Sequence, residues 1–348
     1  SVQIQVPEGI HLLPKLKHLR LETYSFPKAL FKITHLKKLY INLQYLHNDP
    51  KVQSWLEQLK GLEEIEIEHA EKFPLFALQH PNLRKLKVAL IGEKQITIPD
   101  NIGQLSQLEE LVLGGTAHQI PPSIGKLSKL KVLNLPASKT LPSSIGNLQK
   151  LKDLTLYSYR ILPRTMANLT QLEVFSFTGF EKQPVQNFGY VLQRLKNLRE
   201  LDIKGDASIQ DLQVRIAFTS LDSLQRLNLS GPISKVPSEV FKIRNLKKLY
   251  ISDITQPQNV FKEINQPSPI HTLNIISGNI FEIPDQIKYL QNLRMLRLAE
   301  CDLKQISSEI GSLTNLETLD LTGNPSIKSL PESIKKLKKL THISPNFK

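Results

Sequence analysis

The stretch Leu141–Leu156, which reads LPSSIGNLQKLKDLTL, decides the fold because variants of it recur along almost the whole chain. Its second half has the spacing Leu151-x-x-Leu154-x-Leu156, and this spacing starts again about every 23 residues, a period that indicates a repeat architecture. The repeats begin at Leu16, Leu36, Leu62, Leu83, Leu108, Leu130, Leu151, Leu172, Leu198, Leu224, Leu246, Ile270, Leu293 and Leu316, with a partial repeat at Leu340.

Each repeat contains two patterns of apolar residues. Leu154-x-Leu156 alternates apolar and polar residues, which predicts a short strand with one face inward. In Leu141-Pro-Ser-Ser-Ile145-Gly-Asn-Leu148 the apolar residues are spaced by four and three, which predicts one or two helical turns that begin after Pro142. One repeat cannot bury both patterns, but stacked repeats can, so we expect a parallel sheet along one side of a solenoid.

These repeats resemble the leucine-rich-repeat family across essentially the whole chain. The form Leu-Pro-x-x-Ile-Gly-x-Leu-x-x-Leu is similar to the subtype of plant intracellular Ras-group proteins, plant immune receptors and many bacterial repeat proteins. The resemblance predicts an α/β fold, a leucine-rich-repeat solenoid or horseshoe, with a parallel sheet on the concave face and short helices or 3-10 turns on the convex face. The best copies lie at 98–105, 120–127, 141–148 and 330–337.

One position departs from the family pattern. The family commonly places Asn eight residues after the first Leu, where its amide bonds the backbone of adjacent turns, and here only Asn324 clearly fits. Thr116, Ser138 and Cys301 are weak substitutes at the equivalent positions. We therefore expect less regular turns than in consensus repeats.

No Gly/Ser-rich linker divides the chain, which predicts a single domain over 1–348. Residues 1–15 are expected to form an N-terminal cap, 16–330 about fourteen repeats, and 331–348 a C-terminal cap. Three repeats are long. In the first, residues 48–59 predict a helix capped by Asp49 with Pro50 in the first turn and Trp55 inward; residues 206–220 and 256–269 predict outer helices or loops.

The cysteine count, the apolar runs and the net charge restrict the class of protein and its location. The single cysteine, Cys301, allows no intramolecular disulfide, and no secretory signal is visible, so an intracellular location is favoured, while a secreted or host-delivered bacterial protein stays open. No apolar run is long enough for a membrane span. The net charge is +13, but the basic residues are interleaved with acidic ones rather than gathered in a stripe, which disfavours nucleic acid as a partner. We also expect a monomer.

The sequence contains no motif that indicates catalysis. There is no phosphate-binding Gly-rich loop and no paired-cysteine or His-Glu metal motif, so we predict no enzyme, no catalytic residue, no metal and no cofactor. The histidines are scattered and are expected at the surface or in turns. Cys301 is expected to be a structural thiol rather than a nucleophile.

The remaining candidate site is the concave face, where the third, fifth and seventh residues of each repeat should point outward. Early repeats place opposite charges such as Lys38, Glu64 and Lys85 on successive strands, a ladder that can serve the sheet alone. The central repeats are nearly free of charge there, and a runner-up patch farther along suits an acidic partner. The predicted partner-binding residues are Val112, Val132, Asn134, Thr155, Tyr157, Val174 and Ser176 in the centre, and Arg226, Lys248, Tyr250 and Arg297 in the runner-up patch.

These observations predict a non-catalytic recognition module that binds a protein or peptide on its concave face, with Tyr157 as anchor. The alternative is the ligand- or substrate-targeting part of a larger plant-type immune receptor or bacterial effector, with an enzyme domain outside these residues. Carbohydrate binding is a weaker third hypothesis, since it favours clustered aromatic platforms and this face has only scattered tyrosines. The uncharged centre also fits a sheet surface with no ligand at all.

Overall fold

The computed structural model describes residues 8–22, 28–44, 50–90, 95–138, 140–179, 184–205, 210–255 and 260–345. Backbone contacts divide the chain into two compact units, unit 1 (Ser1–Tyr159) and unit 2 (Arg160–Lys348), and each is described by itself. The expectation of a single domain with two caps stays a prediction.

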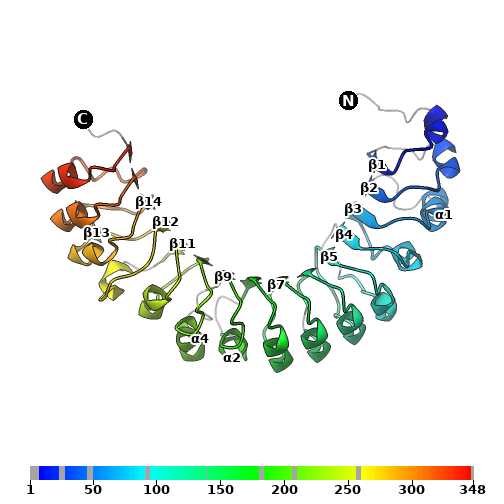
Figure 1. The fold of residues 1–348 in the computed structure, drawn as a ribbon, viewed down its shortest axis with the longest axis horizontal. Helices are drawn as coiled ribbons and strands as arrows, with labels where there is room; N and C mark the ends of the chain where they lie inside the picture. The colour runs from blue at the N-terminus through cyan, green and yellow to red at the C-terminus, as the bar shows by residue number, and fades with distance from the viewer. Residues whose placement is uncertain are drawn as a thin grey trace. The chain divides into compact units, whose positions relative to one another are not determined.

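In unit 1, each repeat contributes one short strand and one helical segment, with the strands on one side of the stack and the helical segments on the other (Figure 1). The strands follow chain order and pair in parallel. They are β1 (His18–Leu21), β2 (Lys38–Asn42), β3 (Glu64–Ala70), β4 (Lys85–Leu90), β5 (Glu110–Leu113), β6 (Val132–Leu135) and β7 (Asp153–Tyr157). The helical segments are η1 (Glu8–Leu12), η2 (Lys28–Lys32), α1 (Pro50–Gln58), η3 (Leu75–Gln79), η4 (Asp100–Gln104), η5 (Pro122–Lys126) and η6 (Ser143–Asn147), where η marks a 3-10 helix.

Unit 2 repeats the same arrangement and adds a small two-stranded sheet, β13–β15. Its strands are β8 (Val174–Thr178), β9 (Glu200–Lys204), β10 (Arg226–Ser230), β11 (Lys248–Ile254), β12 (Thr272–Gly278), β13 (Glu282–Ile283), β14 (Met295–Ala299), β15 (Gln305–Ile306), β16 (Thr318–Asp320) and β17 (His342–Ser344). Its helical segments are η7 (Arg164–Asn168), α2 (Phe188–Leu192), α4 (Leu212–Phe218), η8 (Ser238–Lys242), η9 (Val260–Glu263), η10 (Asp285–Tyr289), η11 (Ser308–Ser312) and η12 (Glu332–Lys336).

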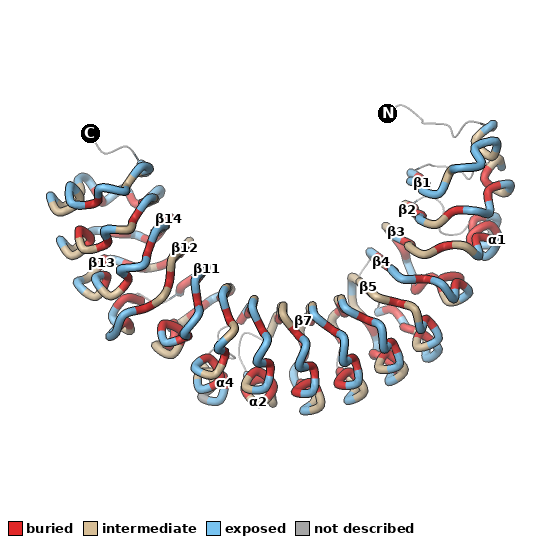
Figure 2. Tube along the Cα trace, in the orientation of Figure 1, coloured by how far each residue is buried: buried red, intermediate tan, exposed pale blue. Residues whose placement is uncertain are grey.

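The leucines of the repeat build the core by stacking on their own copies. In unit 1, Leu111 of β5 is in register with Leu133 of β6, which is in register with Leu154 of β7, and all three are completely buried. Buried residues accordingly line the interior between strands and helical segments in each unit (Figure 2). The predicted parallel sheet with short helical segments is confirmed.

The Leu-Pro-x-x-Ile-Gly stretch forms a 3-10 helix for two physical reasons. The proline lies directly before the helix in extended conformation, as Pro121 and Pro142 do, so the chain enters the turn with a fixed φ. The following glycine permits close approach of the next repeat. A Cβ at Gly125 would lie 2.7 Å from Cβ of Ser144, and closer still to the carbonyl oxygen of Ser144.

Substitution of Gly125 by Ala is expected to lower the free energy of unfolding by about 2 kcal/mol, because the added methyl group forces two adjacent turns apart. The matched control is Gly114→Ala in the same unit, where the nearest atom to a new Cβ is 3.7 Å away. Urea unfolding of both variants measures the difference. Equal stability of the two variants would contradict a close-packing role for the repeated glycine.

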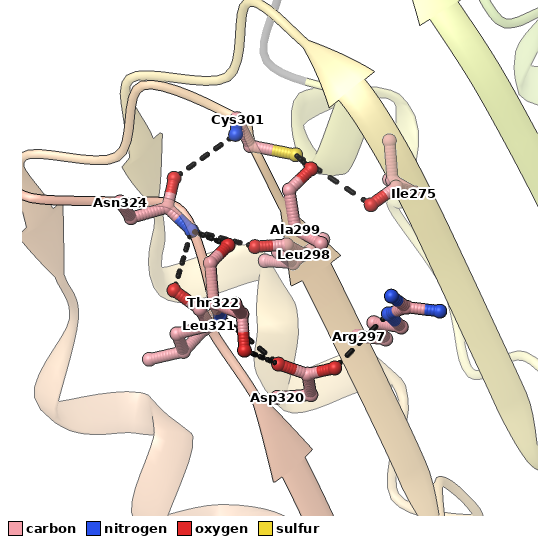
Figure 3. A network of polar contacts seen from close by, with 9 residues as sticks. All are labelled: Ile275, Arg297, Leu298, Ala299, Cys301, Asp320, Leu321, Thr322 and Asn324. Carbon is pink, nitrogen blue, oxygen red and sulfur yellow. Dashed lines mark hydrogen bonds and ion pairs between the residues drawn. The ribbon is translucent and has the colours of Figure 1, made fainter. Parts of the chain in front are cut away.

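Asn324 occupies its expected position and bonds two adjacent turns (Figure 3). Its Oδ1 accepts from the backbone N–H groups of Cys301 at 3.0 Å and Leu303 at 3.1 Å. Its Nδ2 donates to the carbonyls of Leu298, Leu321 and Thr322. One buried side chain therefore closes the turn of its own repeat and ties it to the preceding one.

Other residues at the equivalent position bond in part or not at all. Cys301 is completely buried and its Sγ donates to the carbonyls of Ala299 at 3.2 Å and Ile275 at 3.6 Å, so its role as a weak substitute is confirmed (Figure 3). The buried hydroxyl groups of Thr116 and Ser138 have no hydrogen-bond partner among the described residues, so the expectation that they substitute for Asn was wrong. Tyr159, at the equivalent position of the repeat that begins at Leu151, is buried and its hydroxyl donates to the carbonyl of Pro136 at 2.9 Å.

A second set of asparagines bonds adjacent repeats of unit 2 at the edge where the strands begin. Each comes directly before the first leucine of its repeat and donates from Nδ2 to a backbone carbonyl of the preceding repeat. The pairs are Asn197 with Thr170, Asn245 with Asp222, Asn292 with Ser268, and Asn315 with Gln291. These bonds join adjacent repeats, as the family's asparagine ladder does. They lie before the strands, whereas the asparagine ladder, which is largely missing here, lies after them.

The long repeats contain the expected outer helices. Trp55 of α1 is completely buried, as predicted, and its indole N–H donates to the carbonyl of Ile33. The proposed cap Asp49 lies outside the described residues. Helix α4 falls within 206–220 and η9 within 256–269, apart from 206–209 and 256–259, which are also outside the described residues.

Candidate binding surface on the sheet

Side chains on the open face of each sheet alternate with buried leucines and isoleucines. Strand β7, for example, alternates half-buried Asp153 and Thr155 with buried Leu154 and Leu156, and ends in exposed Tyr157. The outward direction of the third and fifth residues of each repeat follows from this two-residue period and agrees with the sequence prediction. We call this open side of each unit its sheet face.

Unit 1 brings five of the predicted binding residues onto three adjacent strands. Val112, Asn134 and Thr155 are in register as one row, and Val132 lies in the neighbouring row between Glu110 and Asp153. The side chains of Val112, Val132, Asn134 and Thr155 are half-buried. Tyr157 is 41% exposed and forms no ring contact with a described residue. We call these five residues the central patch.

One residue of the predicted outward pattern lies elsewhere. Pro136, at the seventh position of its repeat, is buried rather than outward, and its carbonyl accepts the hydroxyl of Tyr159. The chain turns inward at that point because the strand has ended at Leu135. The alternation of a strand therefore reaches the fifth position of this repeat but not the seventh.

Paired charges flank the central patch on the side of β2–β5. The ammonium group of Lys38 lies 2.9 Å from Glu64, and Glu110 receives both Lys85 at 3.6 Å and Lys87 at 2.8 Å. The predicted ladder of opposite charges is therefore present. Because the lysines are more than a third exposed, each pair is worth about 0–1 kcal/mol.

A hollow of about 470 Å³ lies over the first four strands of unit 1, and sequence analysis missed it. The guanidinium of Arg20 lies 3.8 Å above the ring of Tyr40 at its centre. Burial, followed by hydrogen bonding to Glu68, raises the pKa of the Tyr40 hydroxyl to about 12. The side chains lining the hollow are His18, Arg20, Lys38, Tyr40, Glu64, Glu66, Lys85 and Lys87, together with the strand leucines and isoleucine.

Val174 and Ser176 belong to the sheet face of unit 2. Both are half-buried on β8, and the Ser176 hydroxyl donates to Asp202 on β9 at 3.1 Å. The prediction that they share a binding site with the central patch stays a prediction.

The runner-up patch lies on β10, β11 and β14 of unit 2. Its arginines already have carboxylate partners: Arg226 lies 3.2 Å from Glu200, and Arg297 lies 3.0 Å from Asp320. The Arg226 guanidinium also lies 5.3 Å from the ring centre of Tyr250. Of the three cations among these four residues, only Lys248 has no carboxylate within ion-pair distance in the described chain. It is therefore the cation that an acidic binding partner could pair with directly.

Sequence analysis missed one exposed residue on this face. Met295 is 41% exposed and lies in register with Thr272, which in turn is in register with Lys248. It is the third residue of the repeat that begins at Leu293, so the rule that selected the other outward residues also selects it. Its flexible thioether adds apolar surface to the runner-up patch.

Two groups with the potential for chemistry are buried in the core. Burial raises the pKa of the Cys301 thiol to about 11, which keeps it protonated and agrees with a structural thiol. His80 is completely buried, so the expectation that every histidine lies at the surface or in a turn was wrong.

Among the described residues, no cluster of three or more His, Cys, Asp or Glu side chains is arranged to hold a metal ion, and no helix is long and apolar enough to cross a membrane.

The stacked strands, the 3-10 turns and the inter-turn asparagine define a leucine-rich-repeat solenoid. A family model described as a leucine-rich repeat region matches residues 79–222, and a model for two copies of the repeat matches residues 291–336. The chain is therefore a leucine-rich-repeat protein. Domains with this fold are generally protein- or peptide-binding modules and are typically non-catalytic.

The chain is distantly similar to proteins of several kinds. It is 28% identical over 170 residues to the mouse volume-regulated anion channel subunit LRRC8B, a match that covers 40% of the chain and 21% of that protein. It is 32% identical over 123 residues to the TMV resistance protein N of Nicotiana glutinosa, covering 34% of the chain and 11% of that protein. The chain thus spans about a fifth or less of the length of these relatives.

Solved structures confirm the fold. An LRR protein of Leptospira interrogans, LIC12759, has a TM-score of 0.58 and 22% identity, with 97% of this chain and 100% of that chain covered. The plant peptide hormone receptor RGFR1 in complex with RGF2 has a TM-score of 0.50 and 21% identity, covering 95% of this chain and 54% of that chain.

Proposed function

We propose that the chain is a non-catalytic recognition module that binds a protein or peptide segment on the sheet face of unit 1, at the central patch. The observation that carries the proposal is the exposed ring of Tyr157 at the end of β7, on the same sheet face as the half-buried side chains of Val132 and Val112 and near charges that are already paired. A partner that covers this patch gains apolar burial and an aromatic anchor without breaking the ion pairs of Glu110.

The rigidity of the patch favours binding. Its side chains project from β5, β6 and β7 rather than from loops. Strand β6 is paired with both of the other two, and the leucines of all three are buried in the core. A surface that is formed before association loses little conformational entropy when the partner arrives. Tyr157 has only two rotatable side-chain bonds, so ordering it costs less than ordering a long flexible side chain.

The comparisons favour a polypeptide as the partner class. One solved structure with this fold is a plant peptide hormone receptor in complex with RGF2. The scarcity of charge in the central patch fits a partner segment with apolar and neutral polar side chains, whereas nucleic acid requires a continuous basic surface. The partner of this chain is therefore expected to be a protein or peptide.

The test is a peptide selected from a displayed random library against the unaltered chain. We expect the double variant Tyr157→Ala/Val132→Lys to bind it at least about thirtyfold more weakly, because a central aromatic anchor is worth about 2 kcal/mol. The lysine would lie in register between Glu110 and Asp153, so the sheet should tolerate it. Titration calorimetry measures both dissociation constants.

Two further variants separate the central patch from other surfaces. Leu75→Lys alters an exposed apolar side chain on η3, on the helical side of the same unit, and should leave binding unchanged. Tyr250→Ala/Met295→Lys alters the sheet face of unit 2. A large loss of binding in this second variant, with none in the central-patch variant, would transfer the site to the runner-up patch and contradict the proposal.

A second candidate function is the targeting part of a larger receptor or effector. The matched relatives are much longer than the chain, which covers 21% of the LRRC8B subunit and 11% of the resistance protein N. Such a protein would use the same sheet face for recognition and carry its signalling or enzymatic domain elsewhere. Sequencing the complete reading frame tests this candidate, and a frame without a further domain would contradict it.

A further inference from the structure

The helical side of unit 2 contains two arginines stacked on one tyrosine. The guanidinium carbon of Arg194 lies 3.8 Å from the ring centre of Tyr190, and that of Arg164 lies 5.1 Å from the same ring centre. Tyr190 is half-buried on α2, while Arg164, at the start of η7, and Arg194, just beyond α2, are exposed. Two like charges thus converge on one aromatic ring.

Hydrogen bonds to the protein hold both guanidinium groups in place. Arg194 donates from Nη1 to the carbonyl of Tyr190 at 3.1 Å. Arg164 donates from Nε to Oδ1 of Asn187 at 3.4 Å, and Asn187 is itself fixed because its Nδ2 donates to the carbonyl of Leu162. The remaining N–H groups of both arginines have no hydrogen-bond acceptor among the described residues, so each guanidinium is oriented but only partly used.

The other arginines of unit 2 mostly have a carboxylate partner. Ion pairs join Arg199 to Glu173, Arg215 to Glu239, Arg226 to Glu200, Arg294 to Glu317 and Arg297 to Asp320. In the described chain, no carboxylate lies within ion-pair distance of Arg164 or Arg194. Within the part of the chain that the structure describes, no carboxylate therefore neutralises these two charges, in contrast to the mixed charge elsewhere.

We propose that Arg164, Tyr190 and Arg194 form a binding site for a phosphate monoester group. A guanidinium stacked on a ring keeps its N–H edges free for bidentate bonds to an oxyanion. A phosphate monoester has three acceptor oxygens and a charge of about −2, so it matches two guanidinium groups better than a carboxylate, which has two oxygens and a single charge. The site lies on the helical side and does not depend on the sheet-face proposal.

The test measures binding of three probes to the full chain: inorganic phosphate, a short phosphoserine peptide, and the same peptide without phosphate. We expect saturable binding of the phosphopeptide and no binding of its unphosphorylated form. The variant Arg164→Gln/Arg194→Gln should bind at least about tenfold more weakly, since it removes both charged donors. Binding of inorganic phosphate as well would assign recognition to the phosphate group alone, whereas binding of the phosphopeptide only would include its flanking residues.

The matched control is Arg244→Gln/Lys247→Gln, which removes the same charge from exposed residues of the same unit. It should bind the phosphopeptide as the unaltered chain does. Equal weakening by the two double variants would show a diffuse charge effect and overturn the proposal, as would absence of binding to the unaltered chain. Tyr190→Leu keeps both charges but removes the ring, and full binding by this variant would contradict the role of stacking.

Discussion

Replacement of Asn324 by Ala should lower the free energy of unfolding by about 4 kcal/mol, because it leaves buried backbone groups without partners. The lost bonds are those to the N–H groups of Cys301 and Leu303 and to the carbonyls of Leu298, Leu321 and Thr322. Asn324 is 6% exposed, so water cannot replace these partners without opening the turn. Urea unfolding measures the total effect.

The loss should be local as well as large, since a solenoid is stabilised by contacts between neighbouring repeats. We expect hydrogen exchange to become faster at the amides of Cys301 and Leu303, with little change in unit 1. The matched control is Asn315→Ala, which removes a half-buried asparagine with one bond to the carbonyl of Gln291 and one from Lys339. Similar destabilisation by both substitutions would contradict the role assigned to Asn324.

His80 should make the protein less stable as the pH falls from about 6.5 to about 4. Burial lowers the pKa of His80 to about 4, with help from the charge on Lys60 and against the carbonyl dipoles of Leu59 and Leu56. Below pH 6.5 the unfolded chain binds a proton at this histidine and the folded chain does not, so unfolding becomes more favourable. A shift of this size corresponds to about 3 kcal/mol, present as stability above pH 6.5 and lost below pH 4.

The variant His80→Leu isolates this effect from that of the carboxylates. Equivalent positions in neighbouring repeats hold Leu105, Leu127 and Leu148, all buried, so leucine fits the site. At pH 7 the variant should already be more stable by about 1–2 kcal/mol, because neither ring nitrogen of His80 has a hydrogen-bond partner in the described chain. Unfolding curves at pH 7 and pH 4.5 measure the gap, which should widen at the lower pH. Parallel pH profiles of the two proteins would contradict the buried, neutral histidine.

The fold was predictable because its determinants lie within one repeat. The spacing Leu-x-x-Leu-x-Leu predicts the strand and its buried face. Pro142 marks the start of a 3-10 helix, and Gly125 marks a place where the next repeat approaches too closely for a side chain. The charge ladder also followed from the sequence, since Lys38 and Glu64 occupy equivalent positions in adjacent repeats. Any feature that depends on position within the repeat can be extrapolated in this way.

The features that were missed differ in whether the sequence could have shown them. His80 reads as a polar residue in the sequence, although its position is that of a buried leucine, and alignment of the helical segments would have found it. The stack of Arg164 and Arg194 on Tyr190 joins different repeats through side-chain directions that no periodicity specifies. The pairs of Arg226 with Glu200 and of Arg297 with Asp320, by contrast, join equivalent positions of adjacent repeats, so the sequence could have shown that the arginines of the runner-up patch have partners.

The most direct test of recognition by the sheet face is hydroxyl-radical footprinting of the chain with and without its tightest selected peptide. The account predicts that oxidation of Tyr157 decreases on binding, together with that of Val112 and Val132, while exposed Leu75 on the helical side reacts as before. Protection confined to the helical side, with Tyr157 unchanged in the bound state, would contradict it.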